Sequence, residues 1–236
     1  MKKVVIVFSA LLITMAFLLA ACPRTTPKVG LRKDNRAERM DSYVAEELDP
    51  SRGEWQAPER VIEAVGVRPG DKVAVAWAGA GYFIEPLSKA VGPEGVVYAS
   101  DPDEAMIEKL KQEVKKKGLT NVKIIKSRLE DAQLPYGGVD IAFVVNSQVY
   151  IDLPYAFFDT LRRGVKTGGK LVVIDWRRRS RKGPDKKLRR KKKDMIEILE
   201  GMELELMSDH DFLPYQYFLI FRVVERYGEA SSSCGT

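Results

Sequence analysis

The sequence predicts an α/β fold, in which an open and mostly parallel sheet has helices on both faces. From about residue 57 onward, short apolar runs alternate with amphipathic stretches, and turns rich in Pro and Gly separate them. The apolar runs are continuous, which is typical of parallel strands that are covered on both faces. After the fifth strand the pattern changes, and we expect a last hairpin whose second strand is antiparallel.

The individual elements follow from periodicity and turn residues. A helix is expected at 57–65, where Pro58 lies in the first turn and its missing N–H costs nothing. In the helix expected at 102–117, Met106, Leu110 and Val114 share one face. The sequence further indicates a helix at 37–48, a loop at 53–56, helices at 82–91, 153–165 and 185–200, a turn at 168–169, and strands at 73–76, 96–100, 122–125, 139–145, 171–175, 203–207 and 217–224.

The bulk composition fits one globular domain with appendages. Of 236 residues, 45% are hydrophobic and 31% are charged, which is enough apolar surface for a core. The chain has one His and two Cys, which excludes His-rich and Cys-rich metal sites of the structural zinc type. No acidic cluster suggests a carboxylate site either, so no metal is expected.

Residues 1–21 have the features of an export signal. Two lysines precede an uncharged apolar run that ends at Ala21, as in a positive n-region followed by an apolar h-region. The following junction, LAAC with Cys22 as its last residue, resembles the lipobox of bacterial lipoproteins. The resemblance implies cleavage before Cys22, acylation of that residue with chains such as palmitate, and an exported protein anchored on the envelope or periplasmic side of a membrane.

Two alternatives to a lipoprotein remain open. The apolar run is long enough for an uncleaved signal anchor, since about 20 apolar residues span a bilayer. A start at Met40 would instead give a cytosolic protein. Under the lipoprotein interpretation the chain divides into a signal peptide at 1–21, the lipidated Cys22 and a tether at 22–35, a folded domain at 36–226 and a flexible tail at 227–236.

Four segments of the domain resemble class I S-adenosylmethionine-dependent methyltransferases, whose fold is Rossmann-like. The segments are PGDKVAVAWAGAGYF, VVYASDPDEAM, LPYGGVDIAFVVNS and TGGKLVVIDW, within a resemblance that covers about residues 54–224. The resemblance implies S-adenosylmethionine as cofactor and methyl transfer to an acceptor that the sequence does not identify. A small molecule and a lipid both remain open as the acceptor, and no catalytic residue is assigned.

The turn after the first strand departs from the family pattern. The family has an acid near the strand end and then a G-x-G-x-G turn, which the resemblance places at Val75 and at Trp77, Gly79 and Gly81. A positive φ strains Trp by about 1–2 kcal/mol, and the indole takes volume that the methionine part of the ligand needs. A buried ammonium without its acid costs about 3–5 kcal/mol. In the alternative that stays open, Trp77 turns away and packs under the sheet.

The adenosine half of the implied site is closer to the family pattern. Asp101 ends the second strand, where nucleoside-binding α/β folds bind ribose hydroxyls, although it could instead cap the following helix. The resemblance places Glu130 and Asp131 near adenine, with solvated loop residues as the alternative, and Asn146 where the family holds substrate or catalytic groups. His210, between the last two strands, is either a general base or, as we favour, a structural loop residue.

Residues 177–193 form an intensely basic run with twelve Lys or Arg and a single acid, Asp185. Three interpretations compete: a solvated flap, a surface for anionic lipid or an envelope polymer, and a nucleic-acid site. Nucleic acid is the least favoured, because no aromatic series is interleaved with the charges for stacking on bases.

Two functions remain open at this point. The first is a class I methyltransferase-like lipoprotein that binds its cofactor through Gly79, Gly81, Asp101, Glu130, Asp131 and Asn146. The second is a pseudoenzyme, a non-catalytic envelope lipoprotein that binds an anionic partner or a nucleoside-like ligand. Export would separate the domain from cytosolic S-adenosylmethionine, a charged molecule that does not cross a bilayer freely.

Overall fold

The structure, a computed structural model, describes residue 49, residues 51–147 and residues 150–225. These residues all belong to one compact unit, Leu31–Thr236. The expected signal peptide, Cys22, the tether, the helix at 37–48 and the tail at 227–236 lie outside the described residues. Within the described part, no helix combines the length and the apolar character needed to cross a membrane.

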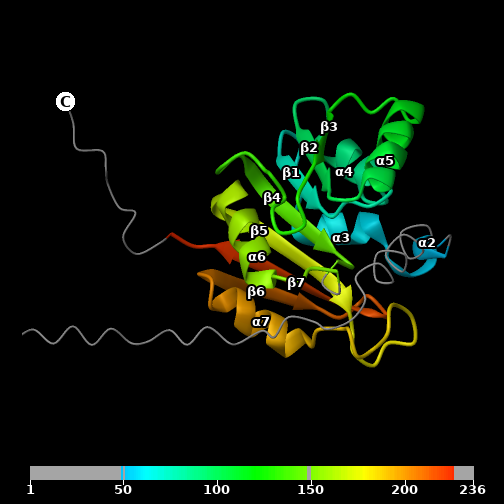
Figure 1. Ribbon diagram of the computed structural model, residues 1–236. Coiled ribbons are helices and arrows are strands. Elements are labelled where there is room, and N and C mark those ends of the chain that lie inside the picture. The colour runs from blue at the N-terminus through cyan, green and yellow to red at the C-terminus, as the bar shows by residue number, and fades with distance from the viewer. Residues whose placement is uncertain (1–48, 50, 148–149, 226–236) are drawn as a thin grey trace, which may run out of the picture. The chain divides into compact units, whose positions relative to one another are not determined.

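A seven-stranded sheet with the order β3-β2-β1-β4-β5-β7-β6 organises the described residues (Figure 1). Strands β1 to β5 run parallel, whereas β7 is antiparallel to both β5 and β6. The prediction of a mostly parallel sheet with an antiparallel end is confirmed. The strands are β1 (Lys72–Ala76), β2 (Val96–Asp101), β3 (Val122–Lys126), β4 (Val139–Val145), β5 (Val165–Trp176), β6 (Leu204–His210) and β7 (Gln216–Val223).

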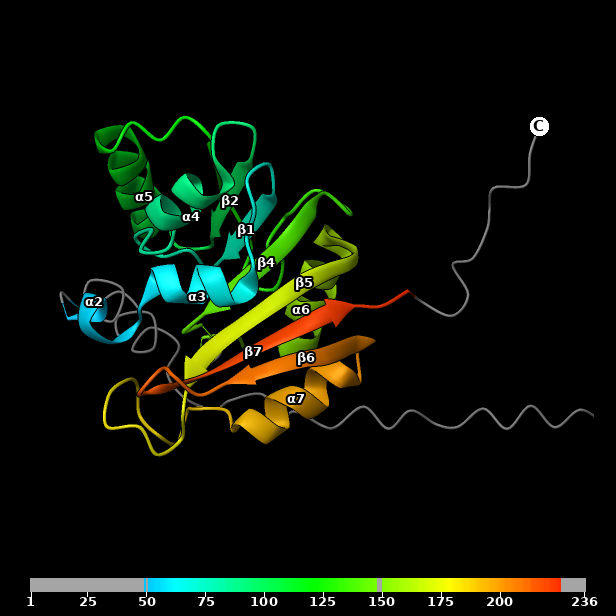
Figure 2. The ribbon, with the colours of Figure 1, turned by 180° about the vertical axis from the view of Figure 1, so that it is seen from behind.

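Helices cover both faces of this sheet, as Figures 1 and 2 show from opposite sides. One core is lined by α3 (Pro58–Val65) and α4 (Ile84–Val91), and the other by α6 (Pro154–Gly164) and α7 (Lys192–Glu200). The side chains of β5 alternate between them, with Val172 and Ile174 in the first core and Leu171 and Val173 in the second. The remaining long helix, α5 (Glu104–Lys116), lies against β2 and β3. Strands buried on both faces need apolar residues at every position, which accounts for the continuous runs.

The strand order reverses between β1 and β4. The chain proceeds from β1 outward to β2 and β3, and from β4 outward in the other direction to β5. In open α/β sheets, ligands bind in the crevice outside the carboxyl ends of the strands at such a switch point. The loops that follow β1 and β4 are therefore where a site is expected.

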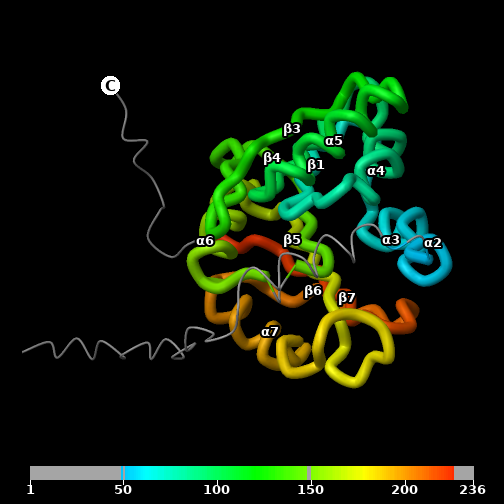
Figure 3. Tube along the Cα trace, turned by 45° about the vertical axis from the view of Figure 1, so that its right-hand side comes forward, coloured from blue at the N-terminus to red at the C-terminus, as the bar shows by residue number. Residues whose placement is uncertain are grey.

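Two predictions of helical structure are corrected. Residues 53–56, predicted as a loop, lie in or directly after α2 (Arg52–Trp55), and the Gln56 N–H donates to the Arg52 carbonyl at 3.0 Å. The helix predicted at 185–200 begins only at Lys192. Leu188 is the only apolar side chain between Asp185 and Lys193, so this stretch has no face that a helix could bury. It instead forms part of a long loop between β5 and α7 (Figure 3).

Strand β5 is longer than predicted. It begins at Val165 and includes Gly168 and Gly169, which the sequence indicated as a turn. Its pairing with β4 shifts register between Val139 and Ile141, so the glycines lie at an irregularity of the ladder. A Cβ on Gly169 would lie 2.7 Å from the Asp140 carbonyl oxygen, which explains why this irregular pairing needs glycine.

We expect Gly183→Ala to destabilise the domain more than Gly70→Ala. Both glycines have a positive φ, of +95° and +89°, so each alanine carries a backbone strain of about 1–2 kcal/mol. A Cβ on Gly183 would also lie 2.4 Å from the Trp176 ring, whereas nothing lies within 4 Å at Gly70. Overpacking adds about 1–3 kcal/mol. Urea unfolding measures both losses, and equal losses would contradict the packing of this loop on Trp176.

Candidate functional site

The glycine turn after β1 lies at the switch point and has the backbone conformation that the family pattern requires. Trp77, Gly79 and Gly81 all have positive φ, of 56°, 58° and 92°. The Ala78 N–H donates to the Ser100 carbonyl at 2.9 Å, which ties the turn to the end of β2. The prediction that Trp77 occupies a left-handed position is confirmed, and its backbone is strained because side chains with a Cβ are disfavoured there.

The Trp77 ring is buried at the carboxyl edge of the sheet. Only 2% of the residue is exposed, and the indole stacks on Tyr150, with ring centroids 6.2 Å apart and planes inclined by 19°. Tyr150 belongs to the segment after β4. Trp77 also shares an apolar cluster with Met106 and Ala132, which come after β2 and β3 in the chain. The same cluster contains Ala76 of β1 and Phe157 of α6, so the indole packs in the core on one face of the sheet, as the alternative that the sequence left open predicts.

The position of the missing acid is part of the hydrophobic core. Val75 is 3% exposed and belongs to the cluster that includes Val61 of α3 and Leu87 of α4. A ligand ammonium near the glycine turn therefore receives no charge compensation from this strand. The altered residues lie on opposite faces of the sheet, Val75 in the core that carries α3 and α4 and Trp77 in the core that carries α6 and α7.

Asp101 fixes the glycine turn from the neighbouring strand. Its side chain is fully buried, and its carboxylate accepts the N–H of Gly79 and the N–H of Asp103, each at 2.8 Å. The alternative that Asp101 caps the next helix is not what the structure shows, because Asp103 is the N-cap of α5 and accepts the Met106 N–H at 2.9 Å. From the end of β2, Asp101 instead accepts a backbone N–H of the glycine turn that follows β1.

Glu130 and Asp131 lie in the segment after β3, at the same edge. Both are half-buried. The Asp131 carboxylate accepts the Gln133 N–H at 2.8 Å, and its carbonyl accepts the Arg128 N–H at 3.0 Å. The Ser127 N–H donates to the Asp101 carbonyl at 3.0 Å, which places the start of this segment directly beside Asp101. Asp131 therefore shapes its own loop, and the loop adjoins the turn.

Asn146 directly follows β4 in a left-handed conformation and is bound to the antiparallel end of the sheet. Its φ is 58°, it is 2% exposed, and its N–H donates to the Ile174 carbonyl at 2.8 Å. The Asn146 side chain accepts a hydrogen bond from the buried Gln216 amide at the start of β7. Sequence reasoning missed Gln216, and the only available signal was one neutral polar residue between two tyrosines in LPYQYF.

His210 lies away from these residues. It is the last residue of β6, not a loop residue as predicted, and β6 is the edge strand that β5 and β7 separate from β4. Its Nε2 lies 3.1 Å from the Ser208 hydroxyl, and its ring packs on Phe218 at 4.7 Å between centroids. The favoured interpretation of a structural loop residue is therefore wrong about the loop, and the contacts of His210 are with Ser208 and Phe218 at the end of the edge strand.

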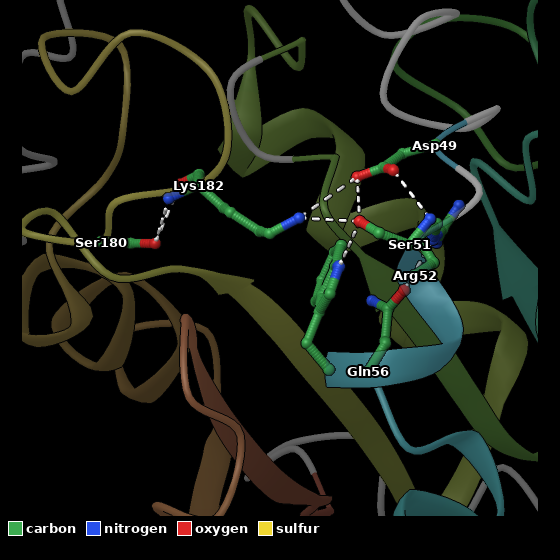
Figure 4. A network of polar contacts seen from close by, with 7 residues as sticks. Asp49, Ser51, Arg52, Gln56, Ser180 and Lys182 are labelled. Carbon is green, nitrogen blue, oxygen red and sulfur yellow. Dashed lines mark hydrogen bonds and ion pairs between the residues drawn. The ribbon is translucent and has the colours of Figure 1, made fainter.

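Helix α2 and the loop after β5 cover the carboxyl end of β5. Lys182 in that loop donates to the Ser51 hydroxyl at 2.7 Å and pairs with Asp49 at 3.8 Å (Figure 4). Beneath this contact, Trp55 packs on Trp176 with 5.1 Å between ring centroids. At least one residue of the basic run, Lys182, therefore makes contacts within the domain.

Comparisons with known proteins agree with this geometry. Residues 75–169 match the family model described as a methyltransferase domain. The ubiquinone/menaquinone biosynthesis C-methyltransferases UbiE of Shewanella pealeana and Shewanella halifaxensis are 27% and 26% identical to this chain over 157 residues. The match covers 65% of this chain and 61% of each relative, so the chain spans less than the full length of these curated relatives.

Solved structures extend the likeness to the whole described domain. A SAM-dependent methyltransferase from Aquifex aeolicus is 30% identical, with a TM-score of 0.74, over 81% of this chain and 100% of that protein. A SAM-dependent O-methyltransferase from Thermotoga maritima, at 16% identity, a TM-score of 0.56 and coverage of 74% of this chain and 67% of that protein, shares the fold. The [4+2]-cyclase SpnF, at 14% identity and a TM-score of 0.66 over 80% of this chain and 96% of that protein, also shares the fold. By its fold and by its likeness to the Aquifex protein, the chain belongs to the class I S-adenosylmethionine-dependent methyltransferase family.

Proposed function

We propose that the domain is a methyltransferase that binds S-adenosylmethionine at the carboxyl ends of β1 and β2, and that the Trp77 ring restricts this binding. The observation that carries the proposal is the backbone of the glycine turn. It is left-handed at all three glycine positions of the motif, and Asp101 holds the Gly79 N–H at 2.8 Å. The backbone therefore suits the ligand, and the Trp77 side chain is the main obstacle.

The adenosine side of the proposed site has suitable acceptors. Asp101 ends β2, where nucleoside-binding α/β folds bind ribose hydroxyls, and its carboxylate accepts the Gly79 and Asp103 N–H groups. Asp131 and its loop adjoin Asp101 through the Ser127 N–H. Bound S-adenosylmethionine would supply an activated methyl group, and the chain would supply positioning, which contributes much of the rate in an in-line displacement.

The methionine side of the proposed site depends on where the indole lies. The Trp77 ring stacks on Tyr150, which joins the turn after β1 to the segment after β4. In the proposal, this ring takes space that the methionine part of the ligand needs. A ligand that needs this space binds only the fraction of molecules in which the ring has moved, and its apparent affinity falls by that fraction. The absence of an acid at Val75 weakens binding further. Weak binding of the methyl donor is therefore part of the proposal.

We expect Trp77→Gly to strengthen binding of S-adenosylmethionine and S-adenosylhomocysteine by at least about tenfold, because glycine vacates the ring's volume and no side chain then has to move before the ligand binds. Isothermal titration calorimetry up to millimolar ligand measures the change. Trp77→Phe is the matched control, since it keeps an aromatic ring at the same left-handed position and should bind no better than the native chain. Failure of both the native chain and Trp77→Gly to bind would contradict the proposal.

The second candidate function is a non-catalytic binding protein. It is favoured by the depth of the Trp77–Tyr150 stack, in which both residues are only 2% exposed. In this case the stack is a permanent part of the core. Trp77→Gly would then open a cavity, lower the free energy of unfolding by about 3–5 kcal/mol as other large-to-small core changes do, and confer no affinity for the methyl donor.

We also propose that the domain is exported and attached to a membrane through acylated Cys22. The support is the sequence of residues 1–22 alone, which lie outside the described residues. Metabolic labelling with a palmitate analogue is expected to label the native chain and not Cys22→Ala. The change Cys234→Ala is the control, because it removes the other cysteine and should leave labelling intact. Persistent labelling of Cys22→Ala would contradict the anchor.

A further inference from the structure

The loop that carries most of the basic run is tied down from within. We call residues 177–191, between β5 and α7, the strap. Arg189, only 6% exposed, donates to four backbone carbonyls of the strap at 2.7 to 3.1 Å, those of Arg177, Ser180, Gly183 and Pro184. Arg177 in turn donates to the carbonyls of Gln216 and Asp211 at 2.7 and 3.1 Å. The strap is therefore a preformed structure.

A hollow of about 500 Å³ lies between the strap, the start of α7 and the β6–β7 hairpin. Four cationic side chains line it, those of Arg177, Arg178, Lys191 and Lys192, against two carboxylates, Asp209 and Asp211. Four positive and two negative charges leave a net charge of +2. The volume is within the range of small-ligand sites, about 300–1,000 Å³.

Two of the cations are available to a ligand. Lys192 pairs with Asp209 at 2.5 Å, and Arg177 is engaged by backbone carbonyls. Arg178 and Lys191 are exposed, and across residues 51–147 and 150–225 neither side chain has a hydrogen bond or ion pair. Because the strap's backbone is fixed, these two unpaired cations stay near the hollow and raise the local concentration of anions there.

The floor of the hollow offers a buried neutral donor. Tyr217 lines it, is 2% exposed, and its hydroxyl has no hydrogen-bond partner among the described residues. Burial raises the pKa of Tyr217 well above its usual value, so the hydroxyl keeps its proton. A buried hydroxyl without a partner costs about 1–3 kcal/mol, and a ligand oxygen would remove this cost. The Nε of nearby Arg190 is also buried without a partner among the described residues.

We propose that this hollow binds a phosphate monoester, held by Arg178 and Lys191 at the rim and by the Tyr217 hydroxyl at the floor. A phosphate monoester carries a charge close to −2 at neutral pH and three strong acceptor oxygens, which match the net charge and the three donors. The site is independent of the proposed methyl-donor site.

The test is calorimetric titration of the full-length chain with sn-glycerol 3-phosphate at low salt, in the absence of S-adenosylmethionine. A parallel arm measures binding to phosphatidylcholine vesicles with and without phosphatidic acid, which presents the same chemical group as a lipid headgroup. Binding in the first arm alone identifies a soluble ligand, and binding in the second alone identifies a lipid. Absence of binding in both arms at 10 mM phosphate groups overturns the proposal.

Matched variants distinguish specific binding in the hollow from non-specific attraction of an anion to the basic strap. Arg178→Gln with Lys191→Gln is expected to weaken binding at least tenfold. Lys186→Gln with Lys187→Gln removes the same charge from exposed positions of the strap outside the hollow, and should change binding by less than threefold. Tyr217→Phe, which removes only the hydroxyl, is expected to weaken binding three- to tenfold. Equal losses in the two double variants, or no loss in Tyr217→Phe, would overturn the assignment.

Discussion

The stack of Trp77 on Tyr150 is the contact on which the state of the candidate site depends. It joins the loops that follow β1 and β4, the two strands between which the strand order reverses. In this fold the crevice between those loops is the place for a ligand, and we propose that the stacked rings restrict access to it. The strain of a left-handed tryptophan opposes the stack, while burial of two large rings stabilises it.

The remaining parts of the site follow from how that turn is fixed. Asp101 holds the Gly79 N–H, and Ser127 connects the loop after β3 to Asp101, so the adenosine side is a connected set of backbone and carboxylate contacts. On the other side, Asn146 is fixed by Gln216 of β7. Membership in the methyltransferase family does not decide the chemistry, because one fold carries many activities. In the proposed function, the Trp77 side chain is what limits entry of the donor.

Much of the fold could be predicted because short stretches of sequence determine the strands and the conformation of the glycine turn. Continuous apolar runs indicated β1 to β5, and the motif positions indicated the left-handed conformation of Trp77, which the structure confirms. The contacts that were missed join distant parts of the chain. Nothing near Asn146 in the sequence indicates Gln216, seventy residues later. Similarly, periodicity extended α7 back to Asp185, because it could not show that Arg189 turns inward to bind the carbonyls of the strap.

The most direct measurement is a crystal structure of the full-length chain grown with S-adenosylhomocysteine. If the two rings close the methionine side of the site, the bound ligand must separate them, and the Trp77 indole should leave its stack on Tyr150 while Asp101 keeps its bond to the Gly79 N–H. A fully ordered ligand at the glycine turn with the stack intact would contradict the central claim that these rings occupy the donor's space.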